Sequence, residues 1–281
     1  QAIAMHSERF AGAVNFDYGA IGGPFKNEWV AVSVIRLGVD GIRDTRDALL
    51  DYGLDGRPNT KDFGENNNRL DEGERLDPSR IKSFNSSEIA VMLSYSRMKS
   101  EKFSYGGNIK LIRKTLGDNS ANGIGFDLGI RSNPVKNLFL GINFQDLTST
   151  LVAWDTGRRE LITPTLKLGL AYLFDLPILS GVMLPSFDLH SNFDGRRSLS
   201  SDLSIGQASL TLLFGVEFTI KDKLAFRIGS SDVEDLTAGV GIIFDRGYID
   251  YSFGSFGVNS TLGNTHRISV TLNFETRKTA S

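Results

Sequence analysis

The chain has 281 residues and a formal net charge of −2, with 31 Lys and Arg against 33 Asp and Glu. This balance argues against nucleic acid as a partner, because nucleic-acid binding needs a basic excess gathered on one face. Cysteine is absent, which excludes disulfides and thiolate metal sites. No run of eighteen apolar residues occurs, so a spanning α-helix is excluded, whereas a barrel of alternating strands is not.

The chain begins with Gln1, which is not an initiator residue. We expect either that a leader has been removed or that the numbering starts part-way along the gene product. The apparent absence of a signal peptide therefore does not indicate the cytoplasm.

Strict alternation of apolar and polar residues is the strongest pattern in the chain. In segment 123–131, Ile124, Phe126 and Leu128 share one face, while Asp127 and Arg131 lie on the other. We predict fourteen such strands, at 2–8, 13–22, 28–38, 87–98, 102–116, 121–132, 137–148, 161–174, 181–194, 207–220, 223–230, 236–245, 247–255 and 266–276. Segment 28–38 is ambiguous, because apolar residues occupy both of its faces.

A soluble β-sandwich also alternates, but its apolar face is mixed at the strand ends, whereas here that face is clean over nine to eleven residues. Aromatic residues near strand ends, such as Tyr105 and Tyr172, are placed as interfacial girdles are. The polar face carries mid-strand charges, at Asp17, Glu88, Lys110, Asp127, Lys167, Asp188, Glu217, Arg227 and Asp250. These features favour an all-β, 14-stranded antiparallel transmembrane β-barrel in a bacterial outer membrane, forming one domain over 1–281.

The alternating faces also predict which polar groups line the lumen. We expect the lumen-facing set to be Asp127, Arg131, Lys167, Asp188, His190, Glu217 and Arg227. Both signs of charge occur in this set, so the residues could line a water-filled channel or pair across a closed interior. Fourteen strands enclose a lumen wide enough to need either water or a plug.

Connection lengths alternate along the chain. Short turns are predicted at 23–27, 99–101, 133–136, 175–180, 221–222 and 246. Longer connections are predicted at 39–86, 149–160, 195–206 and 256–265, and modest ones of the same parity at 9–12, 117–120 and 231–235. Short turns on one side and long loops on the other are typical of outer-membrane barrels. This predicts periplasmic termini and a 48-residue extracellular loop at 39–86.

The 39–86 connection contains two consecutive twelve-residue acidic units, at 51–62 and 63–74. Oxygen-bearing side chains stand near the ligand positions of an EF-hand loop, which predicts a Ca²⁺ site. The predicted ligands are Asp51, Asp55, Asn59, Asp62, Glu65, Asn67, Asp71 and Glu74. Gly53 and Phe63 supply no side-chain oxygen at two ligand positions, and no flanking helices are evident. The alternative is a solvated acidic loop.

No catalytic constellation is present. His6, His190 and His266 lie far apart in sequence, and we expect His190 to join a lumenal hydrogen-bond network beside Asp188 and Asn192. No nucleophile elbow, phosphate loop or dinucleotide fingerprint occurs. The sequence therefore predicts that the protein is not an enzyme.

Three stretches, at 4–21, 125–147 and 152–174, resemble the PorV/PorQ group of outer-membrane proteins, which have the FadL-type fold. The resemblance implies a FadL-like barrel of fourteen strands. It also implies an N-terminal hatch with an Asn-Pro-Ala motif, which would precede Gln1 and leaves the state of the pore undecided.

The resemblance implies two roles. PorV-like members act in type IX secretion, which would make this chain a secretion-associated or surface-assembly scaffold that binds protein partners through its extracellular loops. FadL-like members move hydrophobic compounds, which would make it a channel or transporter for hydrophobic or small solutes. The lumenal charges favour the scaffold. An extracellular assembly anchored by the calcium loop is a third possibility, and the sequence does not indicate the cargo or the oligomeric state.

Overall fold

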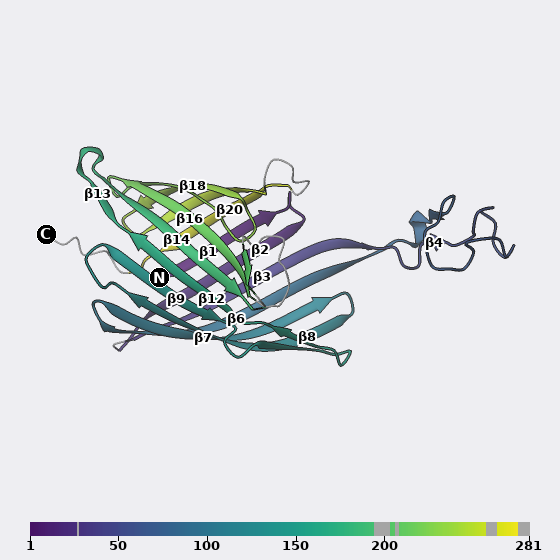
Figure 1. Cartoon of the computed structure of the whole chain (residues 1–281), viewed down its shortest axis with the longest axis horizontal. Helices are drawn as coiled ribbons and strands as arrows, with labels where there is room; N and C mark the ends of the chain where they lie inside the picture. Colours follow the sequence, from purple (N-terminus) through teal and green to yellow (C-terminus); the bar gives the residue numbers. More distant parts are fainter. Residues whose placement is uncertain (27, 194–202, 206–207, 257–262, 275–281) are drawn as a thin grey trace.

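The structure is a computed structural model that describes residues 1–26, 28–193, 203–205, 208–256 and 263–274. Fourteen antiparallel strands form a closed barrel, in which β1 pairs with β2 on one side and with β20 on the other (Figure 1). The strands are β1 (Ala2–Arg9), β2 (Val14–Phe25), β3 (Glu28–Asp44), β6 (Lys82–Ser100), β7 (Phe103–Leu116), β8 (Asn119–Ser132), β9 (Leu138–Gln145), β12 (Thr165–Tyr172), β14 (Gly181–Asn192), β16 (Ala208–Ile220), β17 (Leu224–Gly229), β18 (Leu236–Phe244), β19 (Gly247–Ser255) and β20 (Thr265–Leu272). The predicted fold class and all fourteen predicted strands are confirmed.

Short elements decorate this barrel. They are β4 (Leu49–Leu50), β5 (Arg75–Leu76), β10 (Thr150–Trp154), β11 (Arg159–Ile162), β13 (Phe174–Leu176), β15 (Leu203–Ile205) and the 3-10 helices η1 (Pro78–Arg80) and η2 (Pro177–Leu179). β10 and β11 form a hairpin that fills the predicted 149–160 connection and takes the first two residues of the predicted strand 161–174, so that β12 begins only at Thr165. β10 also pairs with β8. Within the described residues, no helix is long and apolar enough to cross a membrane.

The apolar face of each strand lies outside the barrel. On β8, Ile124, Phe126, Leu128 and Ile130 are 38–48% exposed, as expected of side chains that contact lipid rather than a core. The ambiguous strand β3 is resolved in the same way, because Val30, Val32 and Val34 are exposed and pair with outward residues of β2 and β6.

The connections divide as the sequence predicts. The turns between β2 and β3, β6 and β7, β16 and β17, and β18 and β19 lie at the end of the barrel where β1 begins and β20 ends, and the described longer connections lie at the other end (Figure 1). The connections at 195–206 and 256–265 fall largely outside the described residues. We refer to the two ends as the turn end and the loop end.

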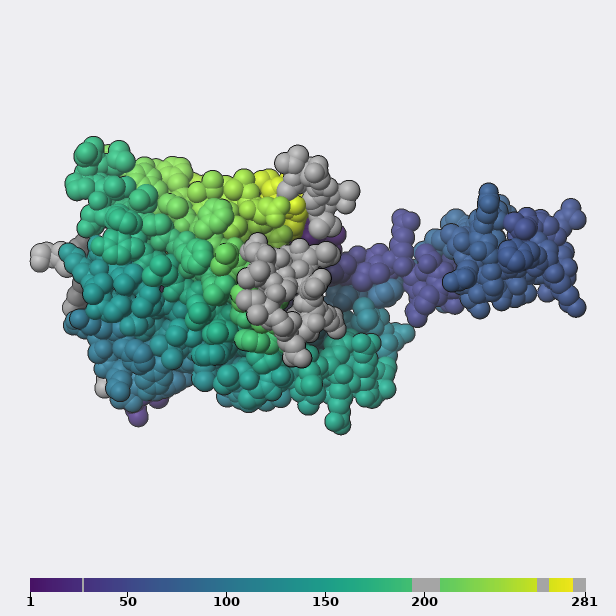
Figure 2. All heavy atoms as spheres, in the orientation of Figure 1, coloured from purple at the N-terminus to yellow at the C-terminus, as the bar shows by residue number. Residues whose placement is uncertain are grey.

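The predicted 39–86 loop is wrong at its boundaries, because β3 runs on to Asp44 and β6 begins at Lys82. The two strands continue beyond the barrel as a paired arm, which ends in a segment that we call the arm tip (residues 45–81; Figures 1 and 2). A bulge lies between Val39 and Ile42, where Gly41 has a positive φ of 66° and donates its N–H to Asn85 Oδ1 at 2.9 Å. The sequence hides this extension because strands in water need no apolar face.

Candidate functional site

The inner face of the barrel is polar. Residues that pair directly across antiparallel strands share a face, so the ladder assigns each side chain to the lumen or the outside. By this criterion all seven predicted lumen residues lie on the inner face, at Asp127, Arg131, Lys167, Asp188, His190, Glu217 and Arg227. The structure groups most of them into three ionic clusters, whose other members come partly from connections.

The first cluster is built around Lys110 on β7. Its Nζ lies 2.7 Å from Asp127 Oδ1 and 2.5 Å from Asp146 Oδ1, and the three side chains are only 8–16% exposed. Thr150 donates a hydrogen bond to Asp146. Gly125 makes room for this contact, since a Cβ there would lie 2.0 Å from the Thr150 hydroxyl. Burying three charges is tolerable only because each has a close partner of opposite sign or a hydrogen bond.

The second cluster joins three strands. Arg227 on β17 donates from Nε to Glu217 Oε2 on β16 at 2.6 Å, and from its other side to Asp250 on β19. The reach to β19 crosses β18, where Gly241 has no side chain to block it. A Cβ on Gly241 would lie 2.3 Å from Asp250 Oδ1 and 3.0 Å from the Arg227 guanidinium. The glycine thus allows the arginine to bridge two carboxylates.

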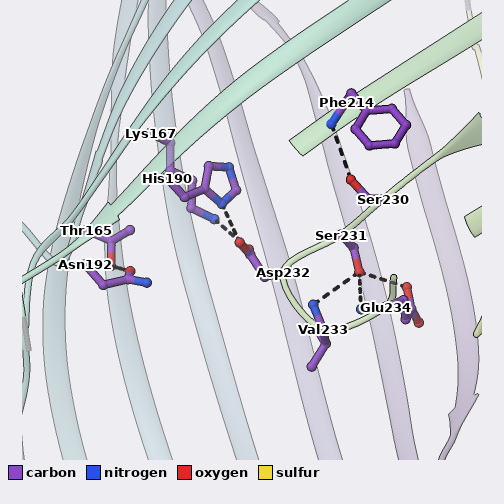
Figure 3. Close-up of polar contacts among 10 residues, drawn as sticks. All are labelled: Thr165, Lys167, His190, Asn192, Phe214, Ser230, Ser231, Asp232, Val233 and Glu234. Atoms are coloured by element: carbon purple, nitrogen blue, oxygen red, sulfur yellow. Dashed lines mark hydrogen bonds and ion pairs between the residues drawn. The ribbon is translucent and has the colours of Figure 1, made fainter. Parts of the chain in front are cut away.

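The third cluster depends on the loop between β17 and β18, residues 230–235, which we call the lumen loop. His190 Nδ1 on β14 lies 2.7 Å from Asp232 Oδ1, and Lys167 Nζ on β12 lies 4.0 Å from Asp232 Oδ2 (Figure 3). His190 therefore joins a lumenal network as predicted, but its partner is Asp232 rather than Asp188 or Asn192. Asn192 instead pairs with Thr165, at 2.8 Å.

The other end of the lumen loop contacts the wall in the opposite direction, at β19 and β20. Glu234 is 4% exposed at its side chain and lies 3.6 Å from Arg267 on β20. Its carboxylate lies over Gly254 of β19, because a Cβ on that glycine would be 2.5 Å from Glu234 Cδ. Sequence analysis missed Asp232 and Glu234, since residues in a connection have no alternating pattern to assign them to a face. It missed Asp146 for another reason: the residue lies in the predicted strand 137–148, on the outward face with Ile142 and Phe144, whereas β9 ends at Gln145.

Two predicted lumen residues lie outside these clusters. The Asp188 carboxylate lies over Gly169 of β12, whose added Cβ would be 2.6 Å from Asp188 Oδ1. The Arg131 guanidinium carbon stands 5.2 Å from the centre of the Phe139 ring, a cation–π distance.

One charge expected on the polar inner face lies outside. Asp17 pairs in register with His6 and Arg36, and His6 pairs with the exposed Ile268. The Asp17 carboxylate contacts His6 Nδ1 at 2.7 Å and Arg36 at 3.2 Å. The prediction for Asp17 was wrong because β2 has apolar and small residues on both faces, so alternation alone does not orient it.

The arm tip brings several predicted calcium ligands together. Glu74 accepts hydrogen bonds from the backbone N–H groups of Gly53 at 2.8 Å and Asp71 at 3.0 Å, which ties the two acidic units to each other. One carboxylate oxygen each of Asp51 and Asp62 is buried without a hydrogen-bond partner. Gly53 lies against Asp62, since a Cβ there would be 1.9 Å from Asp62 Oδ1.

The remaining predicted ligands make local bonds. Glu65 accepts from the N–H groups of Asn59 and Lys61, Asn67 donates to Asp71 at 2.6 Å, and Asp55 accepts from Arg57 at 2.8 Å. Within the described residues, no group of three or more His, Cys, Asp or Glu is placed to hold a metal ion. The Ca²⁺ site stays a prediction.

The lumen is hollow. A cavity of about 680 Å³ at the turn end is lined by Gln1, Trp29, Arg227 and Tyr248, among others. A second of about 320 Å³ continues from Arg227 past Asp188 to Ser230, the first residue of the lumen loop. The interior therefore holds a cavity at the turn end and another below the lumen loop, and Arg227 lines both.

The wall is thin at two adjacent glycines of β7. Gly106 faces the lumen and Gly107 faces outward, as their neighbours in the ladder show. A hollow of about 300 Å³ lies on the inner side and one of about 730 Å³ on the outer side, and Gly106, Gly107 and Asp127 line both. At the two glycines, only the backbone separates the inner hollow from the outer one.

No family model and no curated protein matches this chain. Several solved structures have a similar fold, and all are distant in sequence. The CymD monoaromatic hydrocarbon channel is 10% identical with a TM-score of 0.54, and the match covers 98% of this chain and 87% of that one. The Pseudomonas putida toluene transporter TodX is 10% identical with a TM-score of 0.51, covering 96% and 85%. A Pseudomonas aeruginosa FadL homologue is 12% identical with a TM-score of 0.51, covering 98% and 89%.

These likenesses show a FadL-like fold, and with the closed barrel they place the chain in the outer membrane. Two of these structures are by name a channel and a transporter. They do not test the PorV/PorQ resemblance, which stays a prediction.

Proposed function

We propose that the protein is a non-enzymatic outer-membrane channel for small solutes. The observation that carries this proposal is the polar inner wall with two cavities along it, one lined by Gln1 and Tyr248 at the turn end and one lined by Ser230 beside the lumen loop. A lumen lined by paired charges keeps water and admits solutes without presenting a single-sign barrier. The fold shared with known channels supports the same conclusion.

The test is conduction by the purified barrel in planar bilayers, with vesicle swelling in solutes of graded size alongside. We expect stepwise ionic conductance and swelling that falls as solute size rises. A folded barrel that gives neither would overturn the proposal. A heat-induced mobility shift on a detergent gel serves as the control that the inserted protein is a closed barrel.

The thin wall at Gly106 and Gly107 favours hydrophobic solutes within this class. Such a solute could occupy the outer hollow, which is lined by Leu93, Phe126 and Leu128 among others. We expect a small aromatic compound to equilibrate with vesicle lipid faster in the presence of the barrel, while a sugar of similar size enters the vesicle interior. Equal behaviour of the two compounds would assign the channel to polar solutes alone.

The arm supports a second candidate, a surface or secretion-associated scaffold that meets a protein partner. The arm tip stands far from the barrel (Figure 2) and exposes Leu54, Phe63 and Leu70, of which Phe63 is 83% exposed. Shortening the arm by removal of 45–81 is expected to abolish partner capture and to leave conductance unchanged. Photo-crosslinking at position 63, with the outward barrel position Val240 as control, would identify such a partner.

We also propose Ca²⁺ as the ligand of the acidic arm tip, on the basis of its oxygen-bearing side chains and the two unpartnered carboxylate oxygens. The ion would be held by Asp51, Asp62 and Glu74, with other predicted ligands around them. Its role would be to order a segment that has almost no apolar core.

A further inference from the structure

The lumen loop combines three properties that a passive connection does not need. It folds inward, it is braced by its own hydrogen bonds, and it is tied to the wall at two separated places. Its first residue, Ser230, lines the cavity beside Asp188 and Arg227, so the loop borders the lumen.

Internal bonds make the loop a compact unit. The Ser231 hydroxyl donates to Glu234 Oε2 at 3.0 Å and accepts from the N–H groups of Glu234 at 3.0 Å and Val233 at 3.4 Å (Figure 3). The Ser231 N–H also donates to the Glu234 carbonyl at 3.0 Å. At the base, Ser230 N–H donates to Phe214 O at 3.0 Å. A turn closed in this way holds its shape without help from neighbouring loops.

The ties cross a large part of the wall. From β17, Asp232 reaches β14 and β12 in one direction, past β16, and Glu234 reaches β20 in the other, past β18 and β19. Neighbouring strands are about 4.8 Å apart, so contact with His190 places the Asp232 carboxylate roughly 10 Å along the wall from its own strand. A six-residue connection that spans this distance must lie across the lumen rather than above the rim.

The two ties differ in strength. Glu234 is buried against Arg267 and Gly254, whereas the Asp232 side chain is 48% exposed to water. An exposed ion pair is weak and a buried one is costly to break on one side only. The Glu234 end is therefore the fixed anchor, and the Asp232 end is the one that can release.

We propose that the lumen loop is the constriction of the channel and sets the size of the solutes that pass, with Glu234 as its anchor and Asp232 as its releasable tie. This inference rests on the proposed channel function. It assigns a specificity role to Asp232, Val233 and Glu234, which the alternating pattern of the strands does not reveal.

The absence of cysteine from the chain gives a direct test. In Val233→Cys, a bulky thiol reagent would attach at a side chain that is 56% exposed on the loop, and in the control Leu54→Cys it would attach at the arm tip, 61% exposed. We expect labelling to lower single-channel conductance by about twofold or more in Val233→Cys and to leave Leu54→Cys unchanged, because the narrowest section limits conduction. Unchanged conductance in fully labelled Val233→Cys would overturn the proposal.

Variants that release the loop from the wall should raise conductance, whereas labelling of the loop should lower it. Glu234→Ala should raise conductance and the size limit for swelling, Asp232→Ala should raise them less, and Asp235→Ala should not change them. Asp235 is the matched control, an exposed acid of the same loop with no ion pair among the described residues. Equal conductance in all four proteins would contradict the constriction.

The two proposals fail in different ways. A folded wild-type barrel that conducts, with no effect of labelling or release, contradicts only the constriction. A wild-type barrel that does not conduct contradicts the open channel, and conductance that first appears in Glu234→Ala would then support the loop as the element that closes the lumen. No conductance in either protein overturns both.

Discussion

The barrel wall and the arm tip are held together by different interactions. In the wall, every strand is hydrogen-bonded on both sides, and the register fixes which side chains face lipid. In the arm tip, side-chain oxygens accept from backbone N–H groups at Gly53, Asp55, Asn59, Lys61 and Asn68, and the only regular pairing is the two-residue ladder of β4 and β5. Ala48 is its one fully buried apolar residue. The comparison shows that one chain uses backbone ladders where water is absent and side-chain caps where water is present.

The largest expected effect comes from placing a charge on the lipid-facing side of the barrel wall, with the same change at an exposed ring of the arm tip as the comparison. Val240→Arg at the centre of β18 should destabilise the barrel by about 2–4 kcal/mol, because a guanidinium in mid-bilayer loses its hydration. Phe63→Arg in the arm tip should have almost no effect, since this ring is already in water. Urea unfolding of the barrel in lipid vesicles measures both, and equal stability of the two variants would contradict the outward assignment of β18.

A smaller effect is expected inside the lumen. Lys110→Met leaves Asp127 and Asp146 facing each other without a cation, at a cost of about 1–3 kcal/mol. Adding Asp146→Asn removes the repulsion and should restore most of the loss. The same urea titration reports the result, and a destabilisation that persists fully in the double variant would mean that Lys110 acts through packing.

Removal of calcium by a chelator should affect the arm tip and not the barrel wall. If Ca²⁺ orders the arm tip, a chelator should raise protease cleavage between Asp51 and Glu74 by roughly tenfold, equivalent to about 1.4 kcal/mol of local stability. The unfolding of the barrel should not change. Asp62→Asn is the matched variant, and it should be cleaved at the fast rate with or without calcium. If cleavage of the wild type does not depend on calcium, the Ca²⁺ proposal is contradicted and the segment is a solvated acidic loop.

The smallest effect is electrostatic and confined to the end of the arm. The Arg46 side chain donates to Asp44 at 2.9 Å and 2.7 Å and lowers the pKa of that carboxyl to about 2. Because the folded pKa is depressed, the stabilisation is present above the ordinary carboxyl pKa and is lost as pH falls toward 2. Arg46→Ala should return the Asp44 pKa toward 4. A carboxyl NMR titration measures this change, and an unchanged pKa would mean that the ion pair does not form in solution.

The wall was predictable because its pattern is local. Period-two alternation identified all fourteen strands and the inward orientation of residues such as Asp127 and Glu217, since a strand that separates lipid from water must alternate. It failed where both faces are small or apolar, as at Asp17, and where strands leave the membrane, as beyond Gly38. In these places no difference between lipid and water imposes a pattern.

The sequence by itself therefore determined the barrel, its strand count, the division into a turn end and a loop end, and the acidic composition of the arm tip. Only the tertiary structure decided which charged side chains pair within the lumen. Asp146 pairs with Lys110, Asp250 pairs with Arg227 across the glycines of β18, and Asp232 pairs with His190. These contacts join residues far apart in the chain through barrel curvature and an inward loop. The physical reason is that alternation is a property of one strand, whereas a lumen forms only when fourteen strands close.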